Sequence, residues 1–91
     1  MDTQILMQES QSHICKTYNR FNLALVRGSG CHVWDQEGRE YLDFVAGIAV
    51  CNLGHCPEEI ARVMYEQAQQ LVHVSNLYYT EPQVKLARAL T

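Results

Sequence analysis

The stretch CHVWDQEGREYLDFVAGIAVCNLGH at residues 31–55 decides the fold of this chain. It predicts a β-hairpin followed by a connecting segment that has a glycine near each end. Apolar and polar residues nearly alternate on both sides of the DQEG run at 35–38, and this period of two is typical of half-buried strands. Gly38 can adopt the positive φ of a type I turn that ends in a bulge. Gly47 and Gly54 then enclose a small apolar run.

A third strand is predicted before the hairpin. LALVR at 23–27 is a short strand candidate, and Gly28-Ser29-Gly30 follows it. These glycines lack the third glycine of a dinucleotide-binding loop, so a strand-to-strand turn is favoured over a phosphate loop. The result is a three-stranded antiparallel meander. Its strands are expected at about 22–27, 31–35 and 39–45, and the side chains that can bury on one side or other of it are Val33, Tyr41, Phe44 and Val45.

Helices are predicted before and after the meander in the sequence. A weakly amphipathic helix at about 2–17 takes Asp2 or Thr3 as its N-cap. A stronger signal marks a helix at about 57–72, because Pro57 suits the first helical position and two acidic residues follow it. The apolar stripe of this helix, expected to face a core, contains Ile60, Val63, Met64, Ala68, Leu71 and Val72.

A last helix is predicted from Thr80, which suits an N-cap, with Glu81 and Pro82 in the first turn. The apolar pattern of this helix runs to Thr91 without a C-cap glycine or a polar tail. We therefore expect the chain to be a fragment of a larger protein.

Composition excludes several classes of function. The 91 residues are 47% apolar and carry a formal net charge of −3, and the seven basic residues are scattered singly. No nucleic-acid or anionic-membrane patch is therefore indicated. No apolar stretch is long enough to span a bilayer and no secretory signal opens the chain, which favours the cytoplasm. The four cysteines do not form a secreted disulfide scaffold, and we interpret them as reduced, mostly buried thiols.

Four stretches carry a family resemblance: RGSG at 27–30, VWDQEGREYLDF at 33–44, AGIAVCNLGH at 46–55 and SNLYYTEPQVKLARAL at 75–90. In this order and at this spacing they resemble the class III pyridoxal-phosphate-dependent aminotransferases, and in particular the members that act on N2-acetylornithine. The resemblance runs from about Tyr18 to Leu90. One histidine of the family's usual Gly-His-Cys-His-Pro sequence is missing here.

The resemblance implies the α/β architecture of fold type I aminotransferases. Residues 1–74 would form the N-terminal part of the small domain, and residues 75–91 a connector and the first helix of the large domain. The complete protein would be a homodimer in arginine biosynthesis that moves an amino group from N2-acetylornithine to 2-oxoglutarate with pyridoxal 5'-phosphate. The family's Schiff-base lysine lies far downstream, so the resemblance implies no catalytic or cofactor-binding residue in this chain and no activity of the chain alone.

Four residues are candidates for the substrate pocket or the dimer interface. Ornithine aminotransferases tend to have a tyrosine at the place of Ile48, where it helps to hold a free α-amino group. An isoleucine leaves no polar partner unpaired when the amine is acylated, which favours an acetylornithine-type substrate. By resemblance, His55 and Asn76 lie near the dimer interface and the active-site entrance, and Tyr18 is a pocket-wall residue. Purely structural roles remain open for all four.

Three alternative functions remain open from the sequence. The first is an ornithine-type or other class III aminotransferase. The second is a metal-binding module, since soft ligands gather at Cys31-His32 and at Cys51, His55 and Cys56, although no C-x2-C spacing is present. The third is a free-standing α+β interaction module. Two helices and a meander would leave large apolar faces uncovered in that case.

Overall fold

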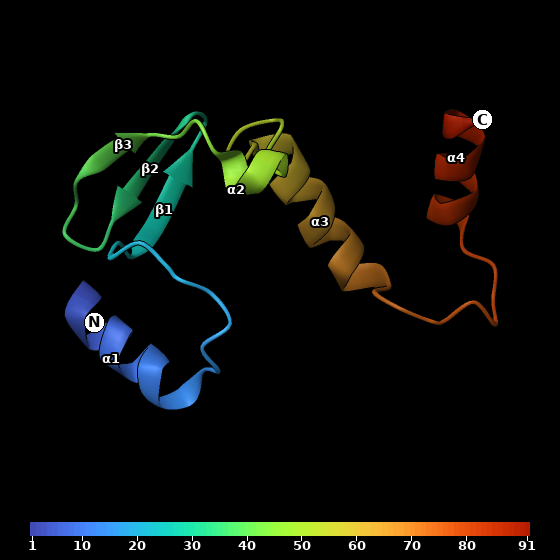
Figure 1. Cartoon of the computed structure of the whole chain (residues 1–91). Helices are drawn as coiled ribbons and strands as arrows, with labels where there is room; N and C mark the ends of the chain where they lie inside the picture. Colours follow the sequence, from blue (N-terminus) through green and yellow to red (C-terminus); the bar gives the residue numbers. More distant parts are fainter. The chain divides into compact units, whose positions relative to one another are not determined.

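A computed structural model describes residues 1–91, and the chain forms two compact units, residues 1–60 and 61–91. The first unit holds the sheet, and the second holds most of the long helix and the last one (Figure 1). In chain order the elements are α1 (Thr3–His13), β1 (Leu25–Ser29), β2 (His32–Asp35), β3 (Glu40–Leu42), α2 (Ala46–Ala49), α3 (Glu58–Gln70) and α4 (Glu81–Leu90).

The three strands form an antiparallel sheet in the order β1-β2-β3, which confirms the predicted meander (Figure 1). Val33 at its centre pairs with Gly28 on one side and with Tyr41 on the other. A bulge lies between Leu25 and Arg27 in β1. A bulge bends a strand and increases its twist, so this edge of the meander is not flat.

The strand limits differ from the predicted ones. β1 begins at Leu25 and continues through Gly28 and Ser29, so the predicted turn at 28–30 is reduced to Gly30 and Cys31. Gly30 has φ +57°, a conformation that a glycine adopts without steric cost. β3 ends at Leu42 instead of residue 45, because the side chain of the next residue, Asp43, bonds the amides ahead of it and turns the chain away.

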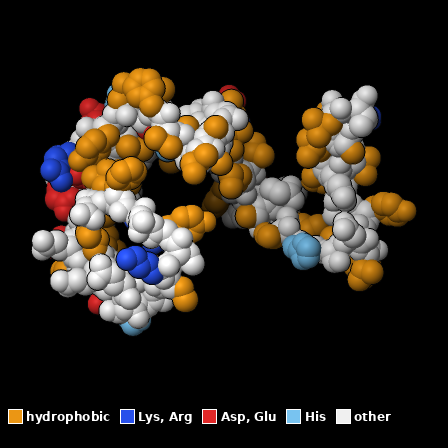
Figure 2. All heavy atoms as spheres, in the orientation of Figure 1, with side chains coloured by type: hydrophobic (Ala, Val, Ile, Leu, Met, Phe, Trp, Pro, Cys, Tyr) orange, Lys and Arg blue, Asp and Glu red, His pale blue; other side chains and the backbone are white.

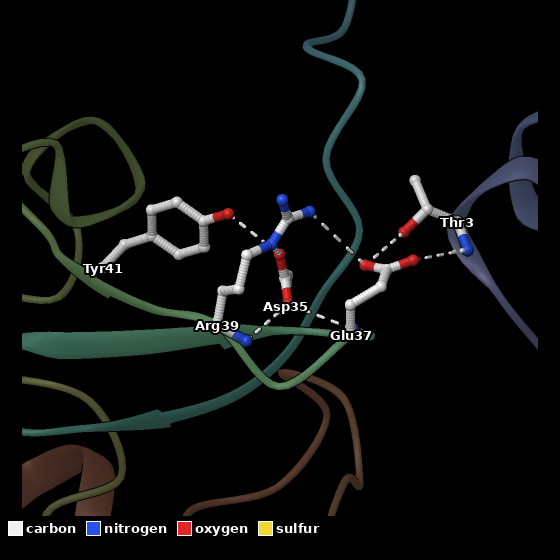
Figure 3. Close-up of polar contacts among 5 residues, drawn as sticks. All are labelled: Thr3, Asp35, Glu37, Arg39 and Tyr41. Carbon is white, nitrogen blue, oxygen red and sulfur yellow. Dashed lines mark hydrogen bonds and ion pairs between the residues drawn. The ribbon is translucent and has the colours of Figure 1, made fainter.

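The hairpin turn between β2 and β3 is organised by one buried carboxylate (Figure 3). Asp35 Oδ1 accepts from the amides of Glu37 and Arg39 at 3.0 and 2.8 Å. Its Oδ2 accepts from Arg39 Nε at 2.9 Å and from the Tyr41 hydroxyl at 2.8 Å. Gly38 has φ +86° and its amide donates to the Asp35 carbonyl at 3.1 Å, which confirms the predicted glycine turn.

Burial and hydrogen bonding act in opposite directions on the pKa of Asp35. Burial by itself raises the pKa, but the hydrogen bonds from the Arg39 amide, the Tyr41 hydroxyl and the Arg39 guanidinium outweigh it, so the pKa lies below its ordinary value. The carboxylate therefore stays ionised while only 1% of the residue is exposed. Buried charge is tolerated because every lone pair that faces the protein has a donor.

Helix α1 begins where the sequence predicts but ends earlier. Asp2 is the N-cap, and its side chain accepts from the Ile5 amide at 2.9 Å. The helix stops at His13 instead of residue 17, because Ile14 takes an extended conformation that suits its β-branched side chain. At its first residue, the Thr3 hydroxyl donates to Glu37 Oε2 at 3.0 Å, which links the helix to the hairpin turn (Figure 3).

Helices α3 and α4 lie close to their predicted positions. α3 begins directly after Pro57 and ends at Gln70, two residues before the predicted limit. Thr80 precedes α4 in extended backbone, as an N-cap does, although its hydroxyl makes no capping bond. Glu81 and Lys85 form an i,i+4 ion pair on the exposed side of α4.

Most predicted core residues are exposed. Val33 is the one buried hydrophobic residue, as predicted, whereas Phe44 is 89% exposed and Val45 65%. The apolar stripe of α3 is also uncovered, and Figure 2 shows hydrophobic side chains over the surface of both units. The cysteines are unpaired, but the prediction that they are mostly buried is wrong, since three are exposed and Cys51 is half-buried.

We predict that Asp35→Asn lowers the midpoint of thermal unfolding of the complete protein by several degrees. An amide nitrogen replaces one acceptor oxygen of the buried Asp35 side chain, so a donor of residue 35 then faces the donor of Arg39 or Tyr41. Circular dichroism during heating measures the shift. Glu37→Gln is the matched control, because its contact with Thr3 is exposed and worth little. Equal midpoints for wild type and Asp35→Asn would contradict the role given to this carboxylate.

Candidate functional site

Residues 43–55 form a loop whose two ends are fixed at one point of the sheet, the turn between β1 and β2. At the first end, the Asp43 amide donates to the Cys31 carbonyl at 2.8 Å. At the second end, His55 and Gly30 exchange two backbone hydrogen bonds of 3.1 and 2.8 Å. The loop therefore leaves the sheet beside Cys31 and returns to it beside the neighbouring residue, Gly30.

A carboxylate–imidazole pair joins the two ends of this loop. His55 Nε2 lies 2.5 Å from Asp43 Oδ2, and since a carboxylate only accepts, the ring nitrogen is the donor. The other oxygen, Asp43 Oδ1, accepts from the amides of Val45 at 2.8 Å and Ala46 at 3.0 Å. The two side chains are largely protected from solvent, with 14% of Asp43 and 21% of His55 exposed.

These donors lower the pKa of Asp43 from 3.8 to about 2. The largest contribution is the hydrogen bond from the Ala46 amide, followed by those from His55 and from the Val45 amide, and burial opposes them only partly. The carboxylate is therefore ionised at neutral pH and at mildly acidic pH, and it accepts from all three donors under those conditions.

The loop contains a short turn of unusual handedness, α2. Four successive residues have positive φ: Ala46 at 54°, Gly47 at 62°, Ile48 at 61° and Ala49 at 61°. Left-handed backbone costs an L-residue roughly 1–2 kcal/mol, and a β-branched residue such as isoleucine is a clear outlier there. Backbone strain of this kind persists only where the surroundings impose it. The sequence analysis did not predict this turn.

Two glycines allow the loop to lie against the sheet. A Cβ atom on Gly28 would lie 2.8 Å from both Cβ and Cγ of His55, a separation that real Cβ atoms do not reach. A Cβ atom on Gly54, which has φ +86°, would lie 3.2 Å from the Gly30 carbonyl oxygen. Gly28 therefore provides the space that His55 occupies, and its role is close approach instead of the turn that the sequence suggested.

Two of the four predicted site residues lie in one loop, and the other two lie outside it. Ile48 and His55 belong to the same loop, and the Ile48 side chain is 86% exposed while that of His55 is largely protected. Tyr18 lies elsewhere in the first unit, along an open cleft of about 780 Å³ between α1 and the segment at 14–24. Asn76 belongs to the second unit, where it is exposed in the connector before α4.

Asp43 is the functional candidate that the sequence analysis missed. The signal was present, since an aspartate at the end of a strand followed by small residues is typical of a side chain that bonds the next amides. Its partnership with His55 spans twelve residues and depends on the Gly30–His55 bridge. No local pattern indicates such a contact.

The possible metal ligands and the two lysines of this chain lie apart from one another. No group of three or more histidine, cysteine, aspartate or glutamate side chains is placed to hold a metal ion, so the metal-module alternative has no support. Of the two lysines, Lys85 pairs with Glu81 in solvent and Lys16 lines the open cleft beside Tyr18. No helix has the length and apolar character needed to cross a membrane.

Comparison with known proteins identifies the class. The family described as Aminotransferase class-III matches residues 14–91, so the chain belongs to the class-III aminotransferases. Proteins of this family depend on pyridoxal phosphate. The chain is 51% identical over 86 residues to the acetylornithine aminotransferase of Gloeobacter violaceus and 56% identical over 75 residues to that of a Nostoc species. These matches cover 94% and 82% of the chain but 22% and 18% of the relatives, so the chain spans about a fifth of their length.

Solved structures share this backbone. The chain superposes on the acetylornithine aminotransferase of Elizabethkingia anophelis with a TM-score of 0.95 at 27% identity, covering 99% of this chain and 24% of that one. The ornithine delta-aminotransferase of Plasmodium falciparum gives the same TM-score at 29% identity, with 99% and 24% covered. The N-acetylornithine aminotransferase of Stenotrophomonas maltophilia gives 0.78 at 39% identity, with 92% and 21% covered.

We predict that Gly28→Ala destabilises the complete protein by about 1–3 kcal/mol, the usual cost of overpacking. The added methyl group collides with Cβ and Cγ of His55, which cannot swing aside as the end of a long side chain does. Urea unfolding monitored by tryptophan fluorescence measures the change. Ser29→Ala is the matched control, because Ser29 follows Gly28 in β1 and its side chain is exposed. A loss for Ser29→Ala as large as that for Gly28→Ala would contradict the close-approach role.

We also predict a pH dependence that belongs to Asp43. Because folding lowers its pKa from 3.8 to about 2, the ionised carboxylate stabilises the fold fully above pH 3.8. That contribution is lost as the pH falls from 3.8 towards 2. The thermal midpoints of wild type and Asp43→Asn should therefore converge across this interval. A constant difference between the two proteins at every pH would show that the Asp43 charge does not contribute.

Proposed function

We propose that the complete protein containing this chain is a pyridoxal-phosphate-dependent aminotransferase that transfers the amino group of N2-acetylornithine to 2-oxoglutarate. The observation that carries the proposal is the identity of 45–56% to several curated relatives, each named acetylornithine aminotransferase. Membership of the class-III family supports the reaction class. The identity of the amino donor rests on the relatives and on Ile48.

The chain supplies the framework of this enzyme and not its chemistry. We assign residues 1–74 to the N-terminal part of the small domain of a fold type I aminotransferase, and residues 75–91 to the connector and first helix of the large domain. The cofactor acts as an electron sink when bound, and the lysine and acidic group that it needs belong to other parts of the protein. The chain alone is therefore inactive. The many uncovered apolar side chains agree with this division, because they need a surface to pack on.

The proposal places the four candidate residues at the border of the active site. Ile48 forms an apolar wall that accepts the acylated amine, and His55 holds the loop that carries it. Tyr18 belongs to the pocket wall, and Asn76 to the entrance or the interface of a homodimer. The complete protein acts in the cytoplasm, in arginine biosynthesis.

Ornithine transamination is the second candidate function. The observation that favours it is the TM-score of 0.95 to the ornithine delta-aminotransferase of Plasmodium falciparum, equal to that for an acetylornithine enzyme. Both kinds of enzyme share this backbone, so the fold does not discriminate between the donors. The side chain at position 48 does, because a tyrosine offers a hydroxyl to a free amine and an isoleucine does not.

We predict that Ile48→Tyr in the complete protein lowers the preference for N2-acetylornithine over ornithine by about tenfold or more, measured as the ratio of the two kcat/KM values. A hydroxyl that finds no partner on the acylated amine disfavours that donor. Leu53→Met is the matched control, since it changes an exposed apolar residue of the same loop.

Two results would contradict the proposal in different ways. A wild-type protein that transaminates ornithine and not N2-acetylornithine would replace the donor but keep the reaction class. A donor preference that is identical in wild type and Ile48→Tyr would remove Ile48 from the pocket.

A further inference from the structure

The loop at residues 43–55 has a shape that its own sequence does not favour. Ala46, Ile48 and Ala49 are all non-glycine residues with positive φ, and isoleucine is poorly suited to that conformation. At the ends of the turn, the Ala49 amide bonds to the Val45 carbonyl, and the amides of Val50 and Cys51 bond to the Ala46 carbonyl. Something outside the turn must hold it.

The external support converges on Asp43. Its Oδ1 atom accepts from the amides of Val45, which precedes the left-handed turn, and Ala46, which is its first residue. Its Oδ2 atom binds His55 Nε2, and His55 is in turn fixed by its backbone to Gly30 and by contact with Gly28. The chain of contacts therefore runs from the sheet through the imidazole and the carboxylate to the base of the turn.

The turn projects its side chain outward. Ile48 is 86% exposed. It is also the one β-branched residue of the turn with positive φ, so its backbone is the least suited to that conformation. A right-handed turn at the same place would direct this side chain elsewhere, because the handedness of the backbone sets the direction of Cβ. The direction of Ile48 is thus a consequence of the contacts that hold the turn.

We propose that Asp43 and His55 form a latch that fixes the left-handed turn and thereby positions Ile48 for recognition of the amino donor. The latch holds position only, and neither residue takes part in a chemical step. This role rests on the proposed function for its link to the donor, while the link between the latch and the turn stands on the geometry alone.

The latch is tested in the complete holoenzyme with two replacements of His55. His55→Phe keeps a flat ring against Gly28 but removes the donor to Asp43, and His55→Gln restores a donor. We expect His55→Phe to raise KM for N2-acetylornithine about tenfold, the cost of one misplaced apolar contact, with kcat changed less than about threefold. In His55→Gln, KM should return most of the way to the wild-type value. Asp35→Asn serves as the control, because it weakens the hairpin turn without touching the loop.

A second measurement reads the loop without reference to activity. Amide hydrogen exchange at residues 44–53 should be faster in His55→Phe by about tenfold and unchanged in Asp35→Asn. Faster exchange with an unchanged KM would overturn the positioning role, and unchanged exchange would overturn the latch itself. An equal rise in KM in His55→Phe and Asp35→Asn would overturn the positioning role and assign His55 a general structural role. If the wild-type holoenzyme does not use N2-acetylornithine, the proposed function fails, and exchange alone then decides whether the pair holds the turn.

Discussion

The backbone bridge between Gly30 and His55 is the constraint on which this part of the protein depends. It brings the end of a thirteen-residue loop back to the first turn of the sheet, beside the point where the loop begins at Asp43. Only after this closure can His55 reach the Asp43 carboxylate, and only then are both ends of the left-handed turn secured. Two residues without side chains, Gly28 and Gly54, make the approach possible.

Features that depend on neighbouring residues were predictable from the sequence. The hairpin follows from alternating residues around Gly38, and α3 follows from Pro57 and the acidic residues after it. The left-handed turn was not predictable, because alanine and isoleucine favour other conformations and its support comes from Asp43 and His55. The limits of β1 were missed for a related reason. Gly28-Ser29 has the composition of a turn, but its glycine serves the contact with His55.

The apolar pattern predicted buried faces on the meander and on α3, and in this chain most of those faces are exposed. Val33 is buried by the sheet itself, whereas the stripe of α3 and the side chain of Phe44 have no cover within the residues of this chain. The chain spans about a fifth of the length of its curated relatives. Periodicity indicates that these helix and strand faces need another surface to pack on, because an amphipathic face is stable only when its apolar side is covered.

The left-handed conformation of Ile48 has a consequence for enzyme engineering. Any replacement at this position alters two free energies together: that of the contact between side chain and ligand, and that of the backbone itself. Asparagine or glycine would relax the main chain even where it recognises nothing, whereas valine would keep the strain and lose little apolar surface. Libraries at this site therefore select for conformational ease as well as for molecular recognition. Comparing valine with asparagine separates the two effects.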